Sequence, residues 1–200
     1  MATINIFGAS GHGRVILDIV RASGHTPGCF YDDAPRCEQL DGVPVAAASP
    51  GNVCGPLVVA VGSNSARRAI ASRYAGTGFA TVVHPSAIVS PSASLGQGTV
   101  VMQGAIVQAA VCTGEHCIIN TGASVDHECR LGDYVHISPH ATLCGNVKVG
   151  DGSWIGAAAV VIPGITIGRG CTIGAGSVVV RDIPDGATAY GNPCRVVKIN

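Results

Sequence analysis

Charged and aromatic side chains are scarce in this chain of 200 residues. Only 12% of the residues are charged and 4% are aromatic, and the 12 basic residues balance the 12 acidic ones. Proteins that bind nucleic acid neutralise phosphates with clustered lysine and arginine, and no basic block occurs here. No apolar run approaches the ~20 residues of a membrane span. We therefore expect neither a nucleic-acid partner nor a membrane-spanning helix.

Paired cysteine motifs are also missing, although the chain contains nine cysteines. Without a CxxC pair a structural zinc site has little support, and we expect no bound metal. The first residues lead directly into an apolar strand pattern, with neither the basic segment nor the cleavage signature of a secretory signal. These observations predict reduced thiols and a cytoplasmic location.

A repeat of six residues occupies residues 83–184. Val, Ile or Leu opens sixteen of its seventeen hexads, Thr113 being the exception, and the fifth position is always small or aliphatic. Two inward positions per hexad predict a three-sided coil with a short parallel strand on each side, and three hexads complete one coil. The unbroken register predicts no looped-out insertion. Glycine recurs at the second and fourth positions, where we expect corners with positive φ.

Three of the cysteines fit this repeat. Cys117, Cys129 and Cys171 fall at fifth positions, where Ala, Ser or Val stands in other hexads. We therefore expect them inside the coil as small hydrophobic residues. Because the predicted coil has a triangular cross-section, a closed three-fold ring is the natural oligomer.

Residues 1–82 have the pattern of a small α/β domain with a parallel, Rossmann-like sheet. Three apolar segments predict strands, at residues 3–7, 28–31 and 57–61. An apolar stripe predicts a helix over residues 14–22, and a second helix is expected through Arg67, Arg68 and Arg73. The sequence GASGHG at residues 8–13 joins the first strand to the first helix.

The carboxyl ends of these parallel strands meet at one edge, which predicts a ligand site there. The glycine turn leads into a helix N-terminus, whose free N–H groups favour phosphate, although its GxxGxG spacing gives dinucleotide binding poor support. Adjacent carboxylates repel pyrophosphate, so we assign Asp32 and Asp33 to a base or to sugar hydroxyls. The alternative, helix caps and solvated turn residues, stays open. The predicted ligand residues are Ser10, Gly11, His12, Asp32, Asp33, Gly62 and Asn64.

Four segments together carry a family resemblance. They are GASGHG at 8–13, the Asp32–Asp33 pair, VGSN at 61–64 and NTGASVDHE at 120–128. In this order they resemble the bacterial sugar O- and N-acetyltransferases of the sialic-acid O-acetyltransferase type, which are left-handed β-helix hexapeptide enzymes. The chain is similar in particular to the N-acetyltransferases of nucleotide-linked 4-amino-4,6-dideoxy sugars in the bacillosamine and perosamine pathways. The likeness covers nearly the whole chain, although Cys194 stands where the family usually has Ala.

The resemblance implies an acetyl-CoA-dependent reaction at one corner of the repeat. It implies that His127 is the general base and that Glu128 raises its basicity, which requires the corner to bring the two side chains together. Gly145 follows His127 by eighteen residues, one coil on, so the two lie ~4.8 Å apart at the same corner. The N–H of Gly145 is then expected to stabilise the oxyanion of the thioester.

The resemblance also implies binding roles. Asn120 matches a residue near the acceptor, and His136 matches a coenzyme A contact that a neighbouring subunit offers. Ala157 and Ala175 match places where backbone meets the pantetheine arm. We therefore expect a homotrimer with active sites between subunits, built from a nucleotide-sugar-binding domain at 1–82, an acyltransferase domain at 83–184 and a tail at 185–200.

For the remaining histidines and the single tryptophan we expect structural or surface positions and no catalytic role. We expect His116 and His140 at the surface and His84 at the domain junction. Trp154 stands at a sixth position, where an exposed edge or a subunit contact is expected.

The expected reaction is direct acetyl transfer to the 4-amino group of a UDP- or GDP-linked deoxy sugar, since no cysteine in the motif offers an acyl carrier. O-acetylation of a sialic acid or a polysaccharide unit is the alternative within the class. A zinc carbonic anhydrase on the same solenoid needs three histidines at a spacing that this chain does not provide. A non-catalytic nucleotide-sugar-binding protein is the third alternative. The nucleotide base, the sugar stereochemistry and the acyl length stay open.

Overall fold

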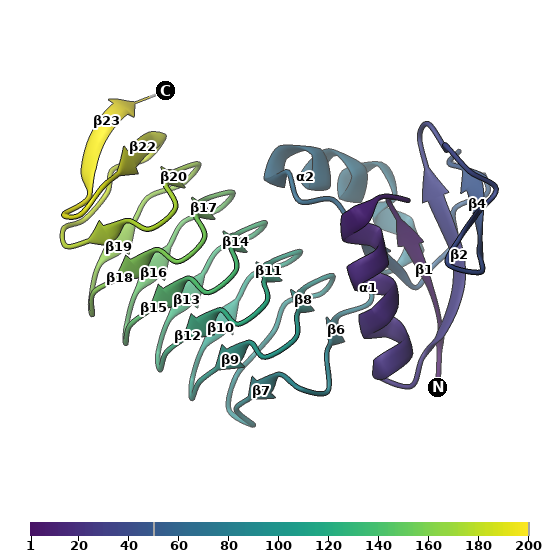
Figure 1. The fold of residues 1–200 in the computed structure, drawn as a ribbon, viewed down its shortest axis with the longest axis horizontal. Helices are drawn as coiled ribbons and strands as arrows, with labels where there is room; N and C mark the ends of the chain where they lie inside the picture. The colour runs from purple at the N-terminus through teal and green to yellow at the C-terminus, as the bar shows by residue number, and fades with distance from the viewer. Residues whose placement is uncertain (50, 200) are drawn as a thin grey trace.

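The computed structural model describes residues 1–49 and 51–199 as an α/β domain followed by a three-sided solenoid (Figure 1). The sheet of the α/β domain has the order β3-β4-β2-β1-β5, in which β3 pairs antiparallel with β4 and the other pairs are parallel. The elements of this domain are β1 (Thr3–Phe7), α1 (Gly11–Ala22), β2 (Thr26–Asp32), β3 (Gln39–Leu40), β4 (Val43–Ala47), β5 (Leu57–Val59), α2 (Asn64–Arg73) and a 3-10 turn (Ala75–Thr77).

The three predicted strands and both predicted helices are present in this domain. The hairpin of β3 and β4 was not predicted, and it contains Pro44, a residue type that is rare in strands except at an edge. The structure tolerates Pro44 because it pairs with Gln39 at the edge, while the parallel pairing of β4 with β2 begins only at Val45.

The solenoid consists of three parallel sheets, which we call face 1, face 2 and face 3. Face 1 contains β6 (Val82–Val83), β8 (Val100–Val101), β11 (Ile118–Ile119), β14 (His136–Ile137), β17 (Trp154–Ile155) and β20 (Thr172–Ile173). Face 2 contains β7 (Ile88–Val89), β9 (Ile106–Val107), β12 (Ser124–Val125), β15 (Thr142–Leu143), β18 (Val160–Val161) and β21 (Val178–Val179). Face 3 contains β10 (Cys112–Thr113), β13 (Arg130–Leu131), β16 (Lys148–Val149) and β19 (Thr166–Ile167). Paired strands such as β11 and β14 are one coil apart, and the predicted fold class is confirmed.

Residues near the two ends of the repeat join face 1. The solenoid pairing begins at Val82, next to the expected domain boundary at 82/83. After the last coil, β22 (Ala187–Tyr190) pairs parallel with β20, and β23 (Arg195–Ile199) pairs antiparallel with β22. The expected tail at 185–200 therefore extends a sheet over its described residues, and every described side chain of β23 is exposed.

The interior of the solenoid follows the hexad pattern. First and fifth positions form one core of Val, Ile, Leu, Ala and Cys side chains, and most of them have no accessible surface. Cys117, Cys129 and Cys171 are at most 1% exposed, so their predicted inward position is confirmed. Each coil buries its apolar first and fifth positions against the next coil, and this burial stabilises the solenoid.

The prediction for the corner glycines is correct only for the fourth position. Gly98 and Gly152 have φ of +70° and +68°, and the non-glycine fourth-position residue Glu128 also has a positive φ. The second-position glycines do not have positive φ. A Cβ on Gly96 or Gly150 would instead collide with backbone atoms of the next coil, so close packing requires glycine there.

A second core joins the two domains. The buried face of α1, which includes Ile16 and Ile19, belongs to the same cluster as Phe30 from the sheet and Val100 and Ile118 from the outer side of face 1. Burial of this shared apolar surface holds the α/β domain on the first coils. The loops at the carboxyl ends of its strands are thereby placed beside face 1 (Figure 1).

Candidate active site between two corners of the solenoid

The histidine–glutamate pair lies at the corner between faces 2 and 3. Glu128 occupies a fourth position with φ +61°, and this backbone bend brings its Oε2 to 3.1 Å from Nδ1 of His127. The Oδ1 of Asp126 accepts a hydrogen bond from the backbone N–H of His127 at 2.7 Å. When Nδ1–H is donated to the carboxylate, the Nε2 lone pair is free to accept a proton. The corner therefore provides the bend that the predicted pairing requires.

Gly145 lies directly beside the imidazole of His127. An ideal Cβ built on Gly145 would lie 2.5 Å from Cε1 and 2.6 Å from Nε2 of that ring. The N–H of Gly145 donates no hydrogen bond to residues 1–49 or 51–199. Both groups open into a surface hollow of about 480 Å³ that Cys144, Pro163 and other corner residues complete. The corner thus combines a free imidazole nitrogen with a free N–H donor.

Asn120 and His136 form a second polar group, on face 1 and its corner with face 2. The Nδ2 of Asn120 lies 3.0 Å from Nε2 of His136, whose ring stacks on Trp154 at a centroid distance of 5.8 Å. His136 is only 7% exposed. Burial, together with the positive charge of Arg67 and with His12, lowers the pKa of His136 to about 4. His136 is therefore neutral at pH 7, and its Nε2 accepts the hydrogen bond from the amide.

The glycine turn of the α/β domain lines a hollow of about 430 Å³ with Ser10, Gly11, Asp32 and Arg36 among its walls. Both carboxylate oxygens of Asp32 already accept hydrogen bonds, from the backbone N–H groups of Ala9 at 2.8 Å and Ala34 at 2.9 Å. Asp32 therefore connects the glycine turn after β1 to the loop after β2, and it also lines the hollow.

The other predicted ligand residues of this domain have varied surroundings. Asp33 forms an ion pair with Arg73 at 2.7 Å and lies outside the residues that line the hollow. His12 is half-buried, and its pKa is lowered by burial and by the charge of Arg67. Its Nε2 has no hydrogen-bond partner among the described residues.

The VGSN loop faces face 1 across a hollow of about 510 Å³. Gly62 and Asn64 line it from the α/β domain, and His136, Gly152 and Trp154 line it from the solenoid. The amide of Asn64 is engaged, because its Nδ2 donates to the carbonyl oxygen of Gly152 at 2.9 Å. Of these two predicted ligand residues, Gly62 is exposed, whereas Asn64 is only partly exposed.

Ala157 and Ala175 line an adjoining hollow of about 440 Å³ along the corner between faces 1 and 2. Its walls are largely apolar and include Pro139 and Ile173. Trp154 belongs to both hollows, and its Nε1–H donates to Oγ of Ser138 at 2.6 Å. Trp154 is 49% exposed in one chain, which agrees with either expected position, an exposed edge or a subunit contact.

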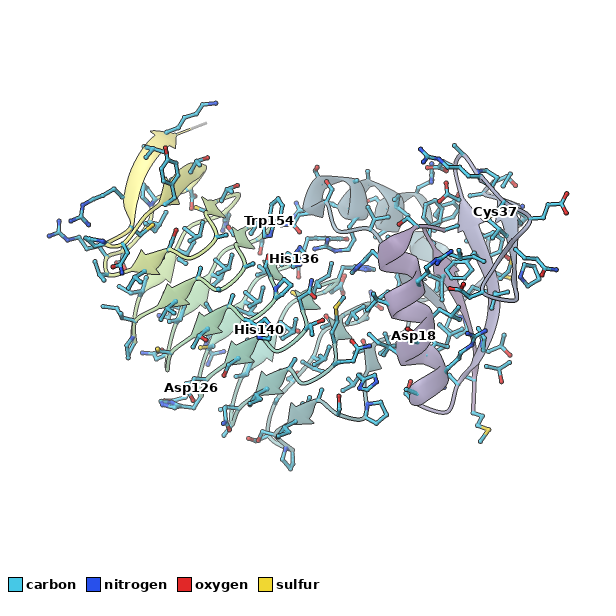
Figure 2. The ribbon with its side chains drawn as sticks, in the orientation of Figure 1. Asp18, Cys37, Asp126, His136, His140 and Trp154 are labelled. Carbon is cyan, nitrogen blue, oxygen red and sulfur yellow. The ribbon has the colours of Figure 1, made fainter. Side chains whose placement is uncertain are left out.

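One chain does not bring all of these groups together. Figure 2 shows His136 and Trp154 on the side of the solenoid near α2, whereas Asp126, the neighbour of His127, lies at the lower left edge of the solenoid. The strands of face 2, including β12, separate the corner of Asn120 from the corner of His127. The candidate site is therefore divided between two corners of the same chain.

Two histidine predictions have different outcomes. His140 is exposed, as expected. His116 was expected at the surface, and this is wrong because it is 1% exposed. Its ring stacks on Tyr134 at 5.1 Å and meets the edge of Phe79 at 4.5 Å, because the α/β domain covers this corner. His84 contacts Ser86 at the start of the solenoid, with Nδ1 2.7 Å from its Oγ.

Neither a metal site nor a membrane span is found within the described ranges. No three His, Cys, Asp or Glu side chains of residues 1–49 and 51–199 come together as ligands for a metal ion. No helix over the same residues has the length and apolar character to cross a bilayer.

The stacked hexapeptide coils and the exposed histidine–glutamate corner define an acyltransferase of the hexapeptide-repeat class. The bacterial transferase hexapeptide family (six repeats) matches residues 146–181, and the PglD N-terminal domain family matches residues 3–74. The comparison with curated proteins returned no match.

Solved structures identify the family. The chain is 42% identical to the acetyltransferase domain of PglB from Neisseria gonorrhoeae FA1090, with a TM-score of 0.90 and coverage of 98% of this chain and 99% of that chain. It is 39% identical to a His-to-Asn mutant of perosamine N-acetyltransferase from Caulobacter crescentus in complex with CoA and GDP-perosamine (TM-score 0.91, coverage 98% and 97%). WeeI from Acinetobacter baumannii AYE is 26% identical (TM-score 0.89, coverage 98% and 100%). The chain belongs to the sialic-acid O-acetyltransferase-type family of bacterial sugar O- and N-acetyltransferases, as its four motifs predict.

Proposed function

We propose that this protein transfers the acetyl group of acetyl-CoA to the 4-amino group of a nucleotide-linked amino-deoxy sugar. The observation that carries the proposal is the pairing of His127 with Glu128 above the free N–H of Gly145. The similarity to a perosamine N-acetyltransferase that binds CoA and GDP-perosamine supports this substrate class.

The corner suits a direct transfer. Nε2 of His127 accepts a proton from the amine as the amine nitrogen attacks the thioester carbonyl carbon. The carbonyl oxygen becomes an oxyanion and accepts a hydrogen bond from the N–H of Gly145. Collapse of the tetrahedral intermediate breaks the carbon–sulfur bond, and the thiolate of CoA takes up the proton from the imidazolium. Glu128 stabilises that imidazolium while it exists.

We propose a homotrimer, because the site is incomplete in one chain. A second copy that places its corner with Asn120 and His136 against the corner of His127 would complete it. The apolar hollow at Ala157 and Ala175 would then lie beside the catalytic corner and receive the pantetheine arm.

The domains divide the work in this proposal. Residues 1–82 hold the nucleotide sugar at the strand-end loops, and residues 83–184 carry out the transfer. In the tail, β22 and β23 extend face 1. The nine free thiols and the need for acetyl-CoA favour the cytoplasm.

A thiol-release assay tests the function. Purified protein is mixed with acetyl-CoA and, in separate reactions, with UDP- and GDP-linked 4-amino sugars, CMP-sialic acid and free sialic acid. The proposal expects CoA release that depends on one of the 4-amino sugars. Release that depends only on a sialic acid would identify an O-acetyltransferase, and no acceptor-dependent release at all would contradict acyl transfer.

A further inference from the structure

Helix α2 docks along the solenoid corner between faces 3 and 1 (Figure 1). Arg67 donates from Nε to the carbonyl oxygen of His116 at 2.8 Å and from Nη2 to that of Tyr134 at 3.0 Å. Asn64 donates to the carbonyl oxygen of Gly152 at 2.9 Å. The three acceptors are fourth-position residues with positive φ in successive coils. The step of three helical residues from Arg67 to Asn64, ~4.5 Å, matches the ~4.8 Å step from the coil of Tyr134 to that of Gly152.

All five N–H donors of the Arg67 guanidinium are occupied. Besides the two solenoid carbonyls, they reach the carbonyl oxygens of Val61 at 3.0 Å and Gly62 at 3.1 Å and Oδ1 of Asn64 at 2.8 Å. Every acceptor is a neutral oxygen, and Arg67 is 1% exposed. A rigid planar fork that joins five oxygens fixes their relative positions far better than a flexible ammonium group could.

These five contacts connect the VGSN loop to the solenoid. Gly62 and Asn64 form one wall of the 510 Å³ hollow, and His136 and Trp154 form the opposite wall. Arg67 hydrogen-bonds to Gly62 and Asn64 of the loop wall and, through the carbonyl oxygen of Tyr134, to the coil that carries His136. Asn64 reaches the next coil, which carries Trp154, through Gly152. Arg67 and Asn64 therefore connect the two walls of the hollow directly.

We infer that Arg67 is a positioning residue that, together with Asn64, sets the VGSN loop, which would hold the nucleotide, against His136 and Trp154 of face 1. The inference rests on the proposed function and deepens it. It also reassigns Asn64, because the amide that the sequence pattern predicts as a substrate contact serves in docking instead. A nucleotide sugar then meets the backbone of the loop and not this side chain.

The positive charge of Arg67 also affects the protonation of His136. The charged or titratable groups that act on His136 are Arg67 from α2 and His12 from α1. Burial lowers the pKa of His136 most, and the Arg67 charge lowers it further. Without that charge the pKa of His136 would be higher, although burial would still lower it. Once protonated, the ring cannot accept the hydrogen bond of Asn120.

Three substitutions on α2 test the inference. Arg67→Met removes both the fork and the charge, and Arg67→Lys keeps the charge but offers three donors in place of five. Arg68→Met is the matched control, because Arg68 is exposed on the same helix and lies over the ring of Tyr134 at 4.7 Å. Each variant is examined by steady-state kinetics, by an NMR titration of His136, and by calorimetric titration with CoA and with UDP or GDP.

We expect Arg67→Met to lower kcat/KM for the nucleotide sugar by ~10²-fold, through a higher KM, a lower kcat or both. This is the typical loss for a displacement of about 1 Å. Its dissociation constant for CoA should stay within about threefold of the wild type. The pKa of His136, followed by the NMR signals of its ring protons, should rise in Arg67→Met. Arg67→Lys should keep the wild-type pKa of His136 but lose acceptor affinity, and Arg68→Met should match the wild type in both. A purely structural role would lower the melting temperature without this separation.

Several results would overturn the inference. Arg67→Lys with wild-type affinity for the nucleotide and wild-type kcat/KM would do so, and this variant decides the matter if Arg67→Met does not fold. Equal losses in Arg67→Lys and Arg68→Met would do so as well. If the wild type binds UDP or GDP but acetylates no nucleotide amino sugar, the proposed function fails alone, and the nucleotide dissociation constants of the variants still test Arg67. If no nucleotide binds, both fail.

Discussion

Gly145→Ala is the substitution that probes the catalytic corner most selectively. Gly145 lies outside the left-handed region of φ, so its backbone can accept alanine without strain. The single obstacle is the ring of His127, at 2.5 Å from the new Cβ, where ordinary contacts begin near 3.4 Å. The imidazole must therefore move by about 1 Å.

The expected effect is large on turnover and small on stability. A displacement of about 1 Å of a catalytic group lowers the rate by ~10²-fold. His127 is more than half exposed, so its ring can swing into solvent without opening a cavity. The lower backbone entropy of unfolded alanine offsets part of any remaining strain, by about 0.4–1 kcal/mol. We expect the free energy of unfolding to change by less than ~1 kcal/mol.

The assay compares kcat/KM from thiol release with the unfolding midpoint in denaturant. Gly76→Ala is the control, because a Cβ there meets no atom within 4 Å. It should leave kcat/KM unchanged and raise the free energy of unfolding by about 0.4–1 kcal/mol. Wild-type turnover in Gly145→Ala would refute the assignment of this corner. A loss of several kcal/mol in stability would refute the view that the ring is free to move.

Three further predictions follow from the site. His127→Ala should lower kcat by ~10²–10⁴-fold, yet elute at the same oligomeric size as the wild type in gel filtration. Glu128→Gln should lower kcat without changing KM for acetyl-CoA, because the imidazolium loses its counter-charge while the hollow stays the same. Acid should destabilise the fold: with the pKa of His136 near 4 in the native state and 6.5 when unfolded, the unfolded chain binds more protons between these values. Urea unfolding should show a loss of roughly 3 kcal/mol from pH 6.5 to pH 4, and a smaller loss in His136→Gln.

The solenoid could be predicted from the sequence because the pattern that specifies it repeats within every six residues. Each hexad repeats the same two inward positions, and residues such as Cys117 and Cys129 fall into these columns by counting alone. The stacking of Gly145 beside His127 follows from the same count of eighteen residues. The sequence predicts the pairing of His127 with Glu128 only if the corner brings the two side chains together. That bend depends on a positive φ at Glu128, which glutamate rarely adopts.

The docking of the two domains could not be predicted in the same way. The acceptors of Arg67 at His116 and Tyr134 are backbone carbonyls, 49 and 67 residues away in sequence. Every residue carries such a carbonyl, so no residue type marks the partner. His116 was assigned to the surface for the same reason, because the helix and Phe79 that cover it come from a different domain.

The central claim is an acetyl transfer that requires a sugar amine. Its most direct measurement is mass spectrometry of the products after wild-type protein and the His127→Ala variant are incubated with acetyl-CoA and UDP- or GDP-linked 4-amino sugars. The account predicts a nucleotide sugar with one added acetyl group, attached to the 4-amino nitrogen, in the wild-type reaction and almost none with the variant. Unmodified 4-amino sugars after complete incubation with the wild type, or equal product with both proteins, would contradict it.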